Sequence, residues 1–560
     1  MTNYQFTGGT ICAPATIPGT GAVSIIRVSG KEALAIADKV IDTKGAPIAE
    51  TEGYRLRYGT VFEADGSVLD NVIVSVFRAP HSYTGENSVE ISCHASRFIV
   101  NKILELLVNA GARIAAPGEF TRRAFVNGKM DLAQAEAVAD VIASQSAASH
   151  RVAMNQLKGG FSSELKVLRE KLLTMTSLLE LELDFSEEDV EFASRKELGQ
   201  LVDDSLTHIG RLTASFSRGN AIKNGVPVAI VGATNTGKST LLNALLGEER
   251  AIVSDIAGTT RDTIEETLNI DGILFRFIDT AGIRETDETI EKIGIDRTFK
   301  KLGEAAVVLG MTDLSRGEAA VLEDTDFILS KVNEMGGVKN VAAENDGSET
   351  GGTSRSETGG TPLAGTDGAS GSETGGTSLV ETGGASQHGH GAGQERKVVI
   401  LVNKCDVAGD FYRDDNGTGY GSGNDLGENM AEIGDNKNVN HDNNIVSLIE
   451  NKYDNCKVIP ISAKTGKGLS TLTKTLGEIG SEITGSTDET LVTNVRHYEA
   501  LVRAASALER VRAGLHIATL PPDLIAQDLR EALYHLGEIV GEITTDETLG
   551  NIFRNFCVGK

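Results

Sequence analysis

Residues 232–239, with the sequence GATNTGKS, have the residue types and the spacing that bind phosphates. They follow a continuous apolar run at 226–231 and precede an apolar segment of helical spacing at 240–246. A glycine-rich turn between a strand and a helix lets backbone amides surround phosphate oxygens at the helix N-terminus. Lys238 would then reach the β- and γ-phosphates, and the Ser239 hydroxyl would ligate Mg²⁺. The motif predicts a nucleoside triphosphate site formed by Asn235, Thr236, Gly237, Lys238, Ser239 and Thr240.

A second phosphate motif follows the predicted strand at residues 275–278. Asp279, Thr280, Ala281 and Gly282 end this strand, which would put a carboxylate beside the metal and a glycine amide at the γ-phosphate. The polar stretch 254–262, between the two motifs, suits a switch loop ordered by the γ-phosphate and Mg²⁺, although a purely structural loop remains open. Within that loop we expect Thr260 to be the second hydroxyl ligand of Mg²⁺.

Ile283 follows this motif where many small GTPases have a water-orienting glutamine. Another group must therefore position the attacking water.

Two further motifs select the base. Asn403, Lys404, Cys405 and Asp406 close an apolar run at 398–402. The Asp406 carboxylate can accept hydrogen bonds from N1–H and the 2-amino group of guanine, whereas adenine has neither donor there. The supporting contacts would come from Asn403, from the Lys404 stem, and from the segment Ser462, Ala463 and Lys464. This order of motifs favours GTP over ATP.

The elements that must position these motifs form a doubly wound α/β domain. Short apolar runs typical of buried parallel strands recur at 226–231, 275–278, 305–309, 398–402 and 457–461, separated by helical stretches. Two insertions, at about 336–396 and 408–444, are rich in Gly, Ser, Thr, Glu, Asn and Asp, and we expect them to be disordered.

Different elements are expected on either side of this domain. Strands at 23–28, 71–77 and 88–92 and a helix at 97–110 predict a compact α+β domain at the N-terminus. From residue 131 to about 221 the pattern is helical, and after about 483 it is helical again. The later helices either complete the earlier bundle, around an inserted α/β domain, or form a separate bundle. The first stretch has an apolar stripe of Leu165, Leu168, Leu172, Leu173, Leu179 and Leu183.

Composition limits the classes of function. The 560 residues allow several domains, and the formal net charge of −26 argues against indiscriminate coating of nucleic acid, so any RNA contact must be local. Five cysteines without a CxxC pair suit a reducing compartment. We expect a soluble, cytoplasmic protein without stable membrane association, because no basic-then-apolar leader and no long apolar run is present.

The chain resembles the tRNA modification GTPase MnmE (TrmE) family in nearly every segment outside the two insertions. The resemblance rests on the GTPase motifs in their order and on separated stretches at 19–30, 82–86, 117–120, 123–136 and 556–560. It implies an N-terminal folate-binding-like α+β and dimerisation domain at 1–127, a helical bundle domain at 128–221 and 484–560, and an inserted P-loop GTPase domain of doubly wound α/β type at 222–483. In the family, a 5-formyl- or methylene-tetrahydrofolate is held at positions that match Arg27, Glu90, Lys129 and Lys560.

The resemblance also implies a mechanism. A K⁺ ion would take the place of an arginine finger, with Asn235, Ser254, Ile256 and Thr259 at the family's ligand positions. Glu291 matches the carboxylate that orients water, and Cys557 matches a cysteine needed for tRNA modification; both count as catalytic residues. The implied partners are a second copy of the chain, an FAD-dependent protein of the MnmG (GidA) type in a heterotetramer, and tRNA.

The implied reaction adds a carboxymethylaminomethyl group to carbon 5 of the wobble uridine. A regulatory GTPase and a ribosome-assembly GTPase remain the alternatives.

Overall fold

The computed structural model describes residues 8–184, 195–249, 266–278, 305–334, 396–406, 445–453, 456–485, 489–517, 521–554, 556 and 559. The chain divides into two compact units. One comprises Met1–Val226, Thr267–Arg276 and Thr473–Lys560, and the other comprises Pro227–Glu266 and Phe277–Leu472. Apart from Arg396, both predicted insertions lie outside the described residues.

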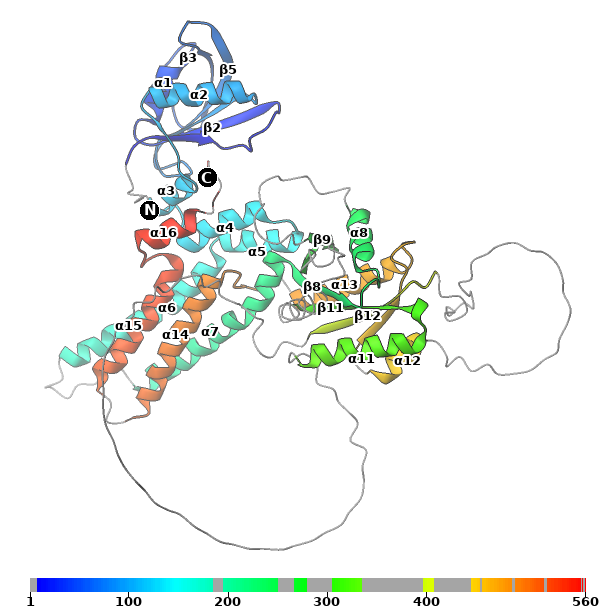
Figure 1. The fold of residues 1–560 in the computed structure, drawn as a ribbon. Coiled ribbons are helices and arrows are strands. Elements are labelled where there is room, and N and C mark those ends of the chain that lie inside the picture. The colour runs from blue at the N-terminus through cyan, green and yellow to red at the C-terminus, as the bar shows by residue number, and fades with distance from the viewer. Residues whose placement is uncertain are drawn as a thin grey trace, which may run out of the picture. The chain divides into compact units, whose positions relative to one another are not determined.

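A seven-stranded sheet forms the N-terminal part of the first unit (blue in Figure 1). Its strand order is β3-β4-β5-β6-β2-β1-β7, and side chains alternate between buried and exposed along β5, as expected for a sheet with one covered face. The three strands predicted here, at 23–28, 71–77 and 88–92, correspond to β2, β5 and β6, and the predicted helix at 97–110 corresponds to α2. The elements are β1 (Ile11–Pro14), β2 (Val23–Ser29), α1 (Ala33–Val40), β3 (Ile41–Thr43), η1 (Ile48–Glu50), β4 (Arg55–Phe62), β5 (Val68–Phe77), β6 (Ser88–His94), α2 (Arg97–Asn109), β7 (Arg113–Ile114) and α3 (Glu119–Val126).

Helices from both ends of the sequence share one apolar core in the same unit. Leu165 and Leu172 of α6 pack with Leu501 of α14 and Leu529 of α15 in this core. The predicted apolar stripe of leucines was wrong at Leu173, whose side chain is 49% exposed. Adjacent residues on a helix point about 100° apart, and Leu172 is the one of the two that faces the core. The helices are α4 (Leu132–Ala143), α5 (Ala147–Leu157), α6 (Gly160–Asp184), α7 (Arg195–Asn224), α14 (Val495–Leu515), α15 (Pro522–Val540) and α16 (Asp546–Arg554).

A buried polar cluster joins the two helical segments. Glu136 of α4 accepts hydrogen bonds from Arg496 Nε and Nη2 of α14, both 3.0 Å long, and its Oε2 lies 2.7 Å from His497 Nε2. Arg496 also donates to the carbonyl oxygens of Glu538 and Ile539 in α15. Burial alone would raise the pKa of Glu136, but His497 and Arg496 outweigh it and lower that pKa to about 2.

A six-stranded sheet with the order β13-β12-β11-β8-β10-β9 carries the nucleotide motifs. β8, β11, β12 and β13 are parallel neighbours, and β8 is buried along nearly its whole length, as the apolar runs predicted. α11 and α12 cover one face and α8 lies on the other (Figure 1). The elements are β8 (Val226–Gly232), α8 (Lys238–Glu249), β9 (Glu266–Ile270), β10 (Ile273–Ile278), β11 (Val307–Asp313), η3 (Leu314–Arg316), α11 (Glu318–Glu334), β12 (Lys397–Asn403), α12 (Ile445–Lys452), β13 (Cys456–Pro460) and α13 (Leu469–Thr484).

The sequence pattern did not predict β9 (Glu266–Ile270), because its residues ETLNI mix polar and apolar types. Its turn into β10 has a local cause: Asp271 and Gly272 take φ values of 52° and 80°, which an Asp-Gly pair tolerates.

Candidate nucleotide-binding site

The phosphate loop connects the end of β8 at Gly232 to the start of α8 at Lys238. Asn235 and Gly237 have φ values of 62° and 97°, in the left-handed region that Asn and Gly tolerate best. A Cβ on Gly237 would lie 2.4 Å from Asn403 Nδ2, and one on Gly232 would lie 2.3 Å from the Met311 carbonyl oxygen. Both glycines are therefore required by close approach of neighbouring groups.

Lys238 is held across this loop by main-chain oxygens. Its Nζ donates to the carbonyl oxygens of Gly232 (2.9 Å) and Ala233 (2.7 Å), and burial lowers its pKa. Because both of these acceptors are neutral carbonyls, an anion brought to Nζ would offset the cost of burying the ammonium. The position suits a phosphate.

Asn403 links three segments that are far apart in the sequence. Its Nδ2 donates to the Thr236 carbonyl oxygen in the phosphate loop (2.6 Å), and its Oδ1 accepts from Ala463 N–H after β13 (3.0 Å). The Asn403 side chain is buried, so both bonds are shielded from water. The Asn403 side-chain amide therefore holds the phosphate loop next to the two predicted base-recognition motifs.

Lys404 and Asp406 follow Asn403 at the carboxyl edge of the sheet. Lys404, at φ 64°, places Nζ 2.6 Å from Asp313 Oδ2 at the end of β11. Burial opposes ionisation of Asp313, but Lys404 and Ser315 outweigh it and lower the pKa of that carboxyl. Asp406 is half-buried, and among the described residues no side-chain hydrogen bond engages its carboxylate. Recognition of a base by this carboxylate stays a prediction.

The segment after β13 is a tight loop. Ser462 N–H donates to the Lys467 carbonyl oxygen (2.9 Å), and Thr465 N–H donates to Ser462 Oγ (3.2 Å). Ser462 and Ala463 are buried and Lys464 is exposed. The loop therefore holds the Ala463 amide toward Asn403.

The N-terminal candidate residues lie in the other unit. Arg27 of β2 pairs with Glu90 of β6, with 2.9 Å between Nη2 and Oε1, and its guanidinium lies over the ring of Tyr83, 5.2 Å from the centroid. Arg27 Nη1 also donates to the Gly559 carbonyl oxygen (3.4 Å), which brings the C-terminal segment to this pair. Lys129 has a different contact, because its Nζ donates to the Pro80 carbonyl oxygen (3.1 Å).

Two family models match the chain: the MnmE helical domain over residues 132–557 and the GTP-binding protein TrmE N-terminus over residues 10–129. A relative from Parabacteroides distasonis, named tRNA modification GTPase MnmE, is 44% identical over 98% of this chain and 100% of its own length. The chain belongs to the MnmE family. Relatives of the same name from Bacteroides thetaiotaomicron and Porphyromonas gingivalis are 43% and 42% identical, covering 98% and 100% of this chain and 99% of each relative.

Several residues at MnmE family positions lie outside the described residues. They are Ser254, Ile256, Thr259, Thr260, Asp279, Thr280, Ala281, Gly282, Glu291, Cys557 and Lys560. Their assignments stay predictions.

Asp313 is a residue that sequence reasoning missed in this MnmE family chain. The expected strand at 305–309 stops four residues short of it, whereas β11 extends to Asp313 and places its carboxylate at the same edge as Lys404. The sequence could have indicated Asp313, because it is a polar residue at the carboxyl end of a predicted parallel strand, and such residues gather at the edge of the sheet where ligands bind.

Within the described residues, no group of three or more His, Cys, Asp or Glu side chains is arranged to hold a metal ion. No described helix combines the length and the apolar composition needed to cross a membrane.

Burial raises the pKa of the Cys12 and Cys93 thiols to about 11 and that of Cys405 to about 12, so these three thiols are poor nucleophiles at neutral pH.

Proposed function

We propose that this chain binds and hydrolyses GTP and couples hydrolysis to modification of tRNA. The observation that carries the proposal is the pair of buried hydrogen bonds from Asn403, which joins the phosphate loop to the segments beside Asp406 and Ala463. A nucleotide bound along this edge would have its phosphates at Lys238 and its base at Asp406. The names of the relatives, tRNA modification GTPase MnmE, support the same activity and substrate.

The residues of the proposed site have separate tasks in hydrolysis. Lys238 and the loop amides bind the β- and γ-phosphates and stabilise charge that develops on them. Ser239, in the first turn of α8, supplies a hydroxyl for Mg²⁺ together with Thr260. Held by these two hydroxyls, a bound Mg²⁺ would neutralise part of the charge of the phosphates. Glu291 is the proposed group that orients the attacking water.

A K⁺ site at the phosphate loop is part of the proposal. Asn235 has a left-handed backbone, with a φ of 62°. Asn adopts this conformation at a lower energetic cost than most other residues that have a side chain, so the backbone itself favours Asn at this position. The Asn235 amide oxygen would ligate K⁺, with Ser254, Ile256 and Thr259 completing the site. A cation there would add positive charge beside the γ-phosphate, as an arginine finger does.

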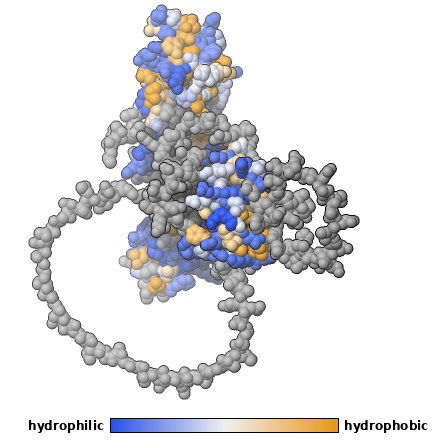
Figure 2. All heavy atoms as spheres, turned by 45° about the vertical axis from the view of Figure 1, so that its right-hand side comes forward, coloured by the Kyte–Doolittle hydropathy of each residue, from blue (hydrophilic) through white to orange (hydrophobic). Residues whose placement is uncertain are grey.

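The N-terminal domain is proposed to hold a tetrahydrofolate and to form a homodimer. The Arg27–Glu90 pair beside Tyr83 and the C-terminal segment supports a polar, aromatic-lined ligand site. The outward face of β4 and β5 supports dimerisation, because Leu56, Tyr58 and Ile73 are 68%, 58% and 48% exposed and Tyr58 is directly opposite Ile73. Hydrophobic residues are visible on the surface of this domain in Figure 2. An FAD-dependent MnmG-type partner would complete the tRNA-modifying complex.

The test is steady-state GTP hydrolysis by the full chain in matched KCl and NaCl buffers. Asn235→Gly removes the amide while keeping the φ of 62° accessible, and Asn235→Asp keeps an oxygen ligand. We expect fast turnover of the wild-type chain in KCl, loss of the K⁺ stimulation in Asn235→Gly, and partial retention in Asn235→Asp. Equal wild-type rates in both salts would remove the K⁺ mechanism, and no hydrolysis in either salt would remove the GTPase proposal.

A further inference from the structure

The segment 82–86, with the sequence SYTGE, lies between β5 and β6 and brings Tyr83 to the proposed ligand site. The Arg27 guanidinium lies against two rings at that site, 5.2 Å from the centroid of Tyr83 and 5.7 Å from that of Phe120. Phe120 belongs to α3, so the two rings come from different parts of the chain. The surroundings of Arg27 therefore depend on how segment 82–86 is fixed to α3.

Arg123 of α3 joins these two parts of the chain. Its Nη1 donates to both carboxylate oxygens of Glu86, at 3.0 Å each. Its Nη2 donates to Glu119 Oε1 (3.0 Å) and to the Gly9 carbonyl oxygen (2.8 Å). The Arg123 side chain is only 2% exposed, and a charge buried this deeply is costly unless its hydrogen bonds are well aligned. One guanidinium thus ties together segment 82–86, α3 and the N-terminal segment.

The carboxylate of Glu119 is kept ionised by its other partners. Its oxygens also accept from Arg113 Nη1 (2.8 Å) and from Ala116 N–H (3.0 Å). Burial opposes ionisation of Glu119, but the hydrogen bonds from Arg113, Ala116 and Arg123 outweigh it and lower the pKa of that carboxyl. Arg123 therefore has a charged acceptor within its own helix, which fixes the guanidinium before it reaches segment 82–86.

Further hydrogen bonds hold the middle of segment 82–86. Tyr83 Oη lies 2.8 Å from Thr121 Oγ1 of α3, and the Thr84 carbonyl oxygen accepts from Asn127 Nδ2 (2.7 Å). On the other side, Thr84 Oγ1 lies 2.7 Å from Ser29 Oγ at the end of β2. Thr84 is almost fully buried, so these bonds are shielded from water. The segment is held between β2 and α3.

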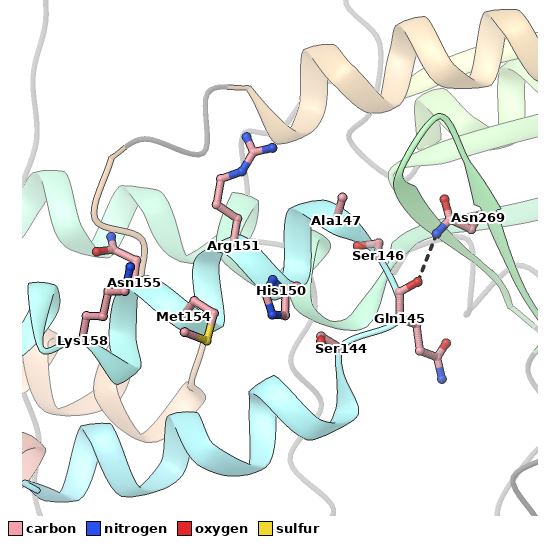
Figure 3. Close-up of a pocket in the computed structure, with 10 residues that line it drawn as sticks. All are labelled: Ser144, Gln145, Ser146, Ala147, His150, Arg151, Met154, Asn155, Lys158 and Asn269. Atoms are coloured by element: carbon pink, nitrogen blue, oxygen red, sulfur yellow. Dashed lines mark hydrogen bonds between the residues drawn. The ribbon is translucent and has the colours of Figure 1, made fainter.

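Support from several elements distinguishes this site from the hollow on the helical domain in Figure 3. The side chains around that hollow come from α5 and the residues next to it, apart from Asn269. The groups around Arg27 come from β6, segment 82–86 and α3. Side chains that are locked by neighbouring elements lose less conformational entropy when a ligand binds.

We propose that Arg123 is a positioning residue of the tetrahydrofolate site. It acts through Tyr83, because fixing segment 82–86 to α3 holds the Tyr83 ring against Arg27 before the ligand arrives. The inference rests on the proposed tetrahydrofolate site and deepens it. A lysine cannot take the place of Arg123, since an ammonium lacks the planar fork that reaches two carboxylates and a carbonyl oxygen at once.

The experiment titrates 5-formyl-tetrahydrofolate into the full chain by calorimetry and measures the urea midpoint of each variant alongside. Arg123→Lys keeps the charge but removes the fork. Glu86→Ala cuts the same link from the other side; Glu86 is 24% exposed, so this variant carries the test if Arg123→Lys does not fold. The matched control is Arg496→Lys in the helical domain, because Arg496 is also bonded to a buried carboxylate, that of Glu136.

Ordering one long side chain on binding costs roughly 2- to 12-fold in affinity. With both Arg27 and Tyr83 released, Arg123→Lys and Glu86→Ala should each weaken binding by about 5- to 100-fold. The control should lose stability but bind within about twofold of the wild-type chain. Equal weakening in the control, or wild-type affinity in either folded variant, would overturn the inference while leaving the proposed ligand in place. A wild-type chain that binds no tetrahydrofolate would instead contradict the proposed function of this domain, and the inference with it.

A second background separates positioning from a general weakening of the domain. In Tyr83→Leu the ring is already absent, so adding Arg123→Lys should weaken binding by less than about twofold further. If Arg123 only stabilised the fold, the added change would cost the same factor with or without the Tyr83 ring. Such additive losses would overturn the inference.

Discussion

Asn403 offers the sharpest test of how the nucleotide site is built. Asn403→Ala removes the donor to the Thr236 carbonyl oxygen and the acceptor for Ala463 N–H. Both residues are almost fully buried, at 1% and 4% exposure, so water cannot readily replace the lost partner. Each buried group left unpaired costs about 1–3 kcal/mol, and the two together should lower the free energy of unfolding of this unit by roughly 2–6 kcal/mol.

Asn403→Asp separates the two bonds. A carboxylate oxygen can still accept from Ala463 N–H, but it faces the Thr236 carbonyl oxygen without a hydrogen to donate. We therefore expect both variants to bind a fluorescent GDP analogue at least about tenfold more weakly than the wild-type chain, which corresponds to about 1.4 kcal/mol. Because the chain has no Trp, the analogue and circular dichroism supply the signals.

The control for this test is Asn333→Ala on α11. Among the described residues Asn333 Oδ1 is buried without a hydrogen-bond partner, so its removal should change the urea midpoint little and GDP binding not at all. The reasoning is refuted if Asn403→Ala matches Asn333→Ala in both measurements.

Three further predictions concern single contacts. Gly237→Ala should weaken GDP binding by more than about tenfold, because the new Cβ would lie 2.4 Å from Asn403 Nδ2. The control is Gly247→Ala, whose Cβ would have open space around it. This control should bind GDP normally, and its free energy of unfolding in urea should rise by up to about 1 kcal/mol. His497 and Arg496 lower the pKa of Glu136 below its ordinary value of 4.5, so the stability that the Glu136 carboxylate contributes is present above pH 4.5 and is lost as the pH falls below that value. Glu136→Gln should accordingly be less stable than the wild-type chain at pH 7, with a gap in urea midpoint that narrows by pH 3; a constant gap would contradict this. Lys404→Met should lower stability by about 1–3 kcal/mol by leaving the Asp313 carboxylate without its cation, and a second change, Asp313→Asn, should restore much of the loss in a double-mutant cycle.

The parallel strands could be predicted from sequence because burial on both faces leaves little choice of residue. β8 and β12 are almost entirely apolar, and the apolar runs located them to within a residue or two. β9 was not found, since a strand with polar positions resembles a loop in composition. The Leu173 error has a similar origin: a run of leucines is apolar at every position, and only packing decides which ones face the core.

The motifs predicted which residue types meet the nucleotide but not how these residues hold one another. Asn403 was expected to support the base, and its two buried hydrogen bonds depend on strands β8, β12 and β13 being adjacent in space. The pairing of Asp313 with Lys404 depends on the β11–β12 register in the same way. Contacts between residues 60 to 167 positions apart are set by tertiary structure, which no local pattern encodes.

Whether Asp406 selects guanine is tested by comparing the binding of GTP and of xanthosine triphosphate by the wild-type chain and by Asp406→Asn. The wild-type carboxylate can accept from the guanine N1–H and 2-amino group, whereas xanthine has a carbonyl at that position, which an asparagine amide can donate to. We predict that the wild-type chain prefers GTP by at least about 100-fold and that Asp406→Asn reverses the preference. An Asp406→Asn variant that still prefers GTP as strongly as the wild-type chain would contradict guanine recognition by Asp406.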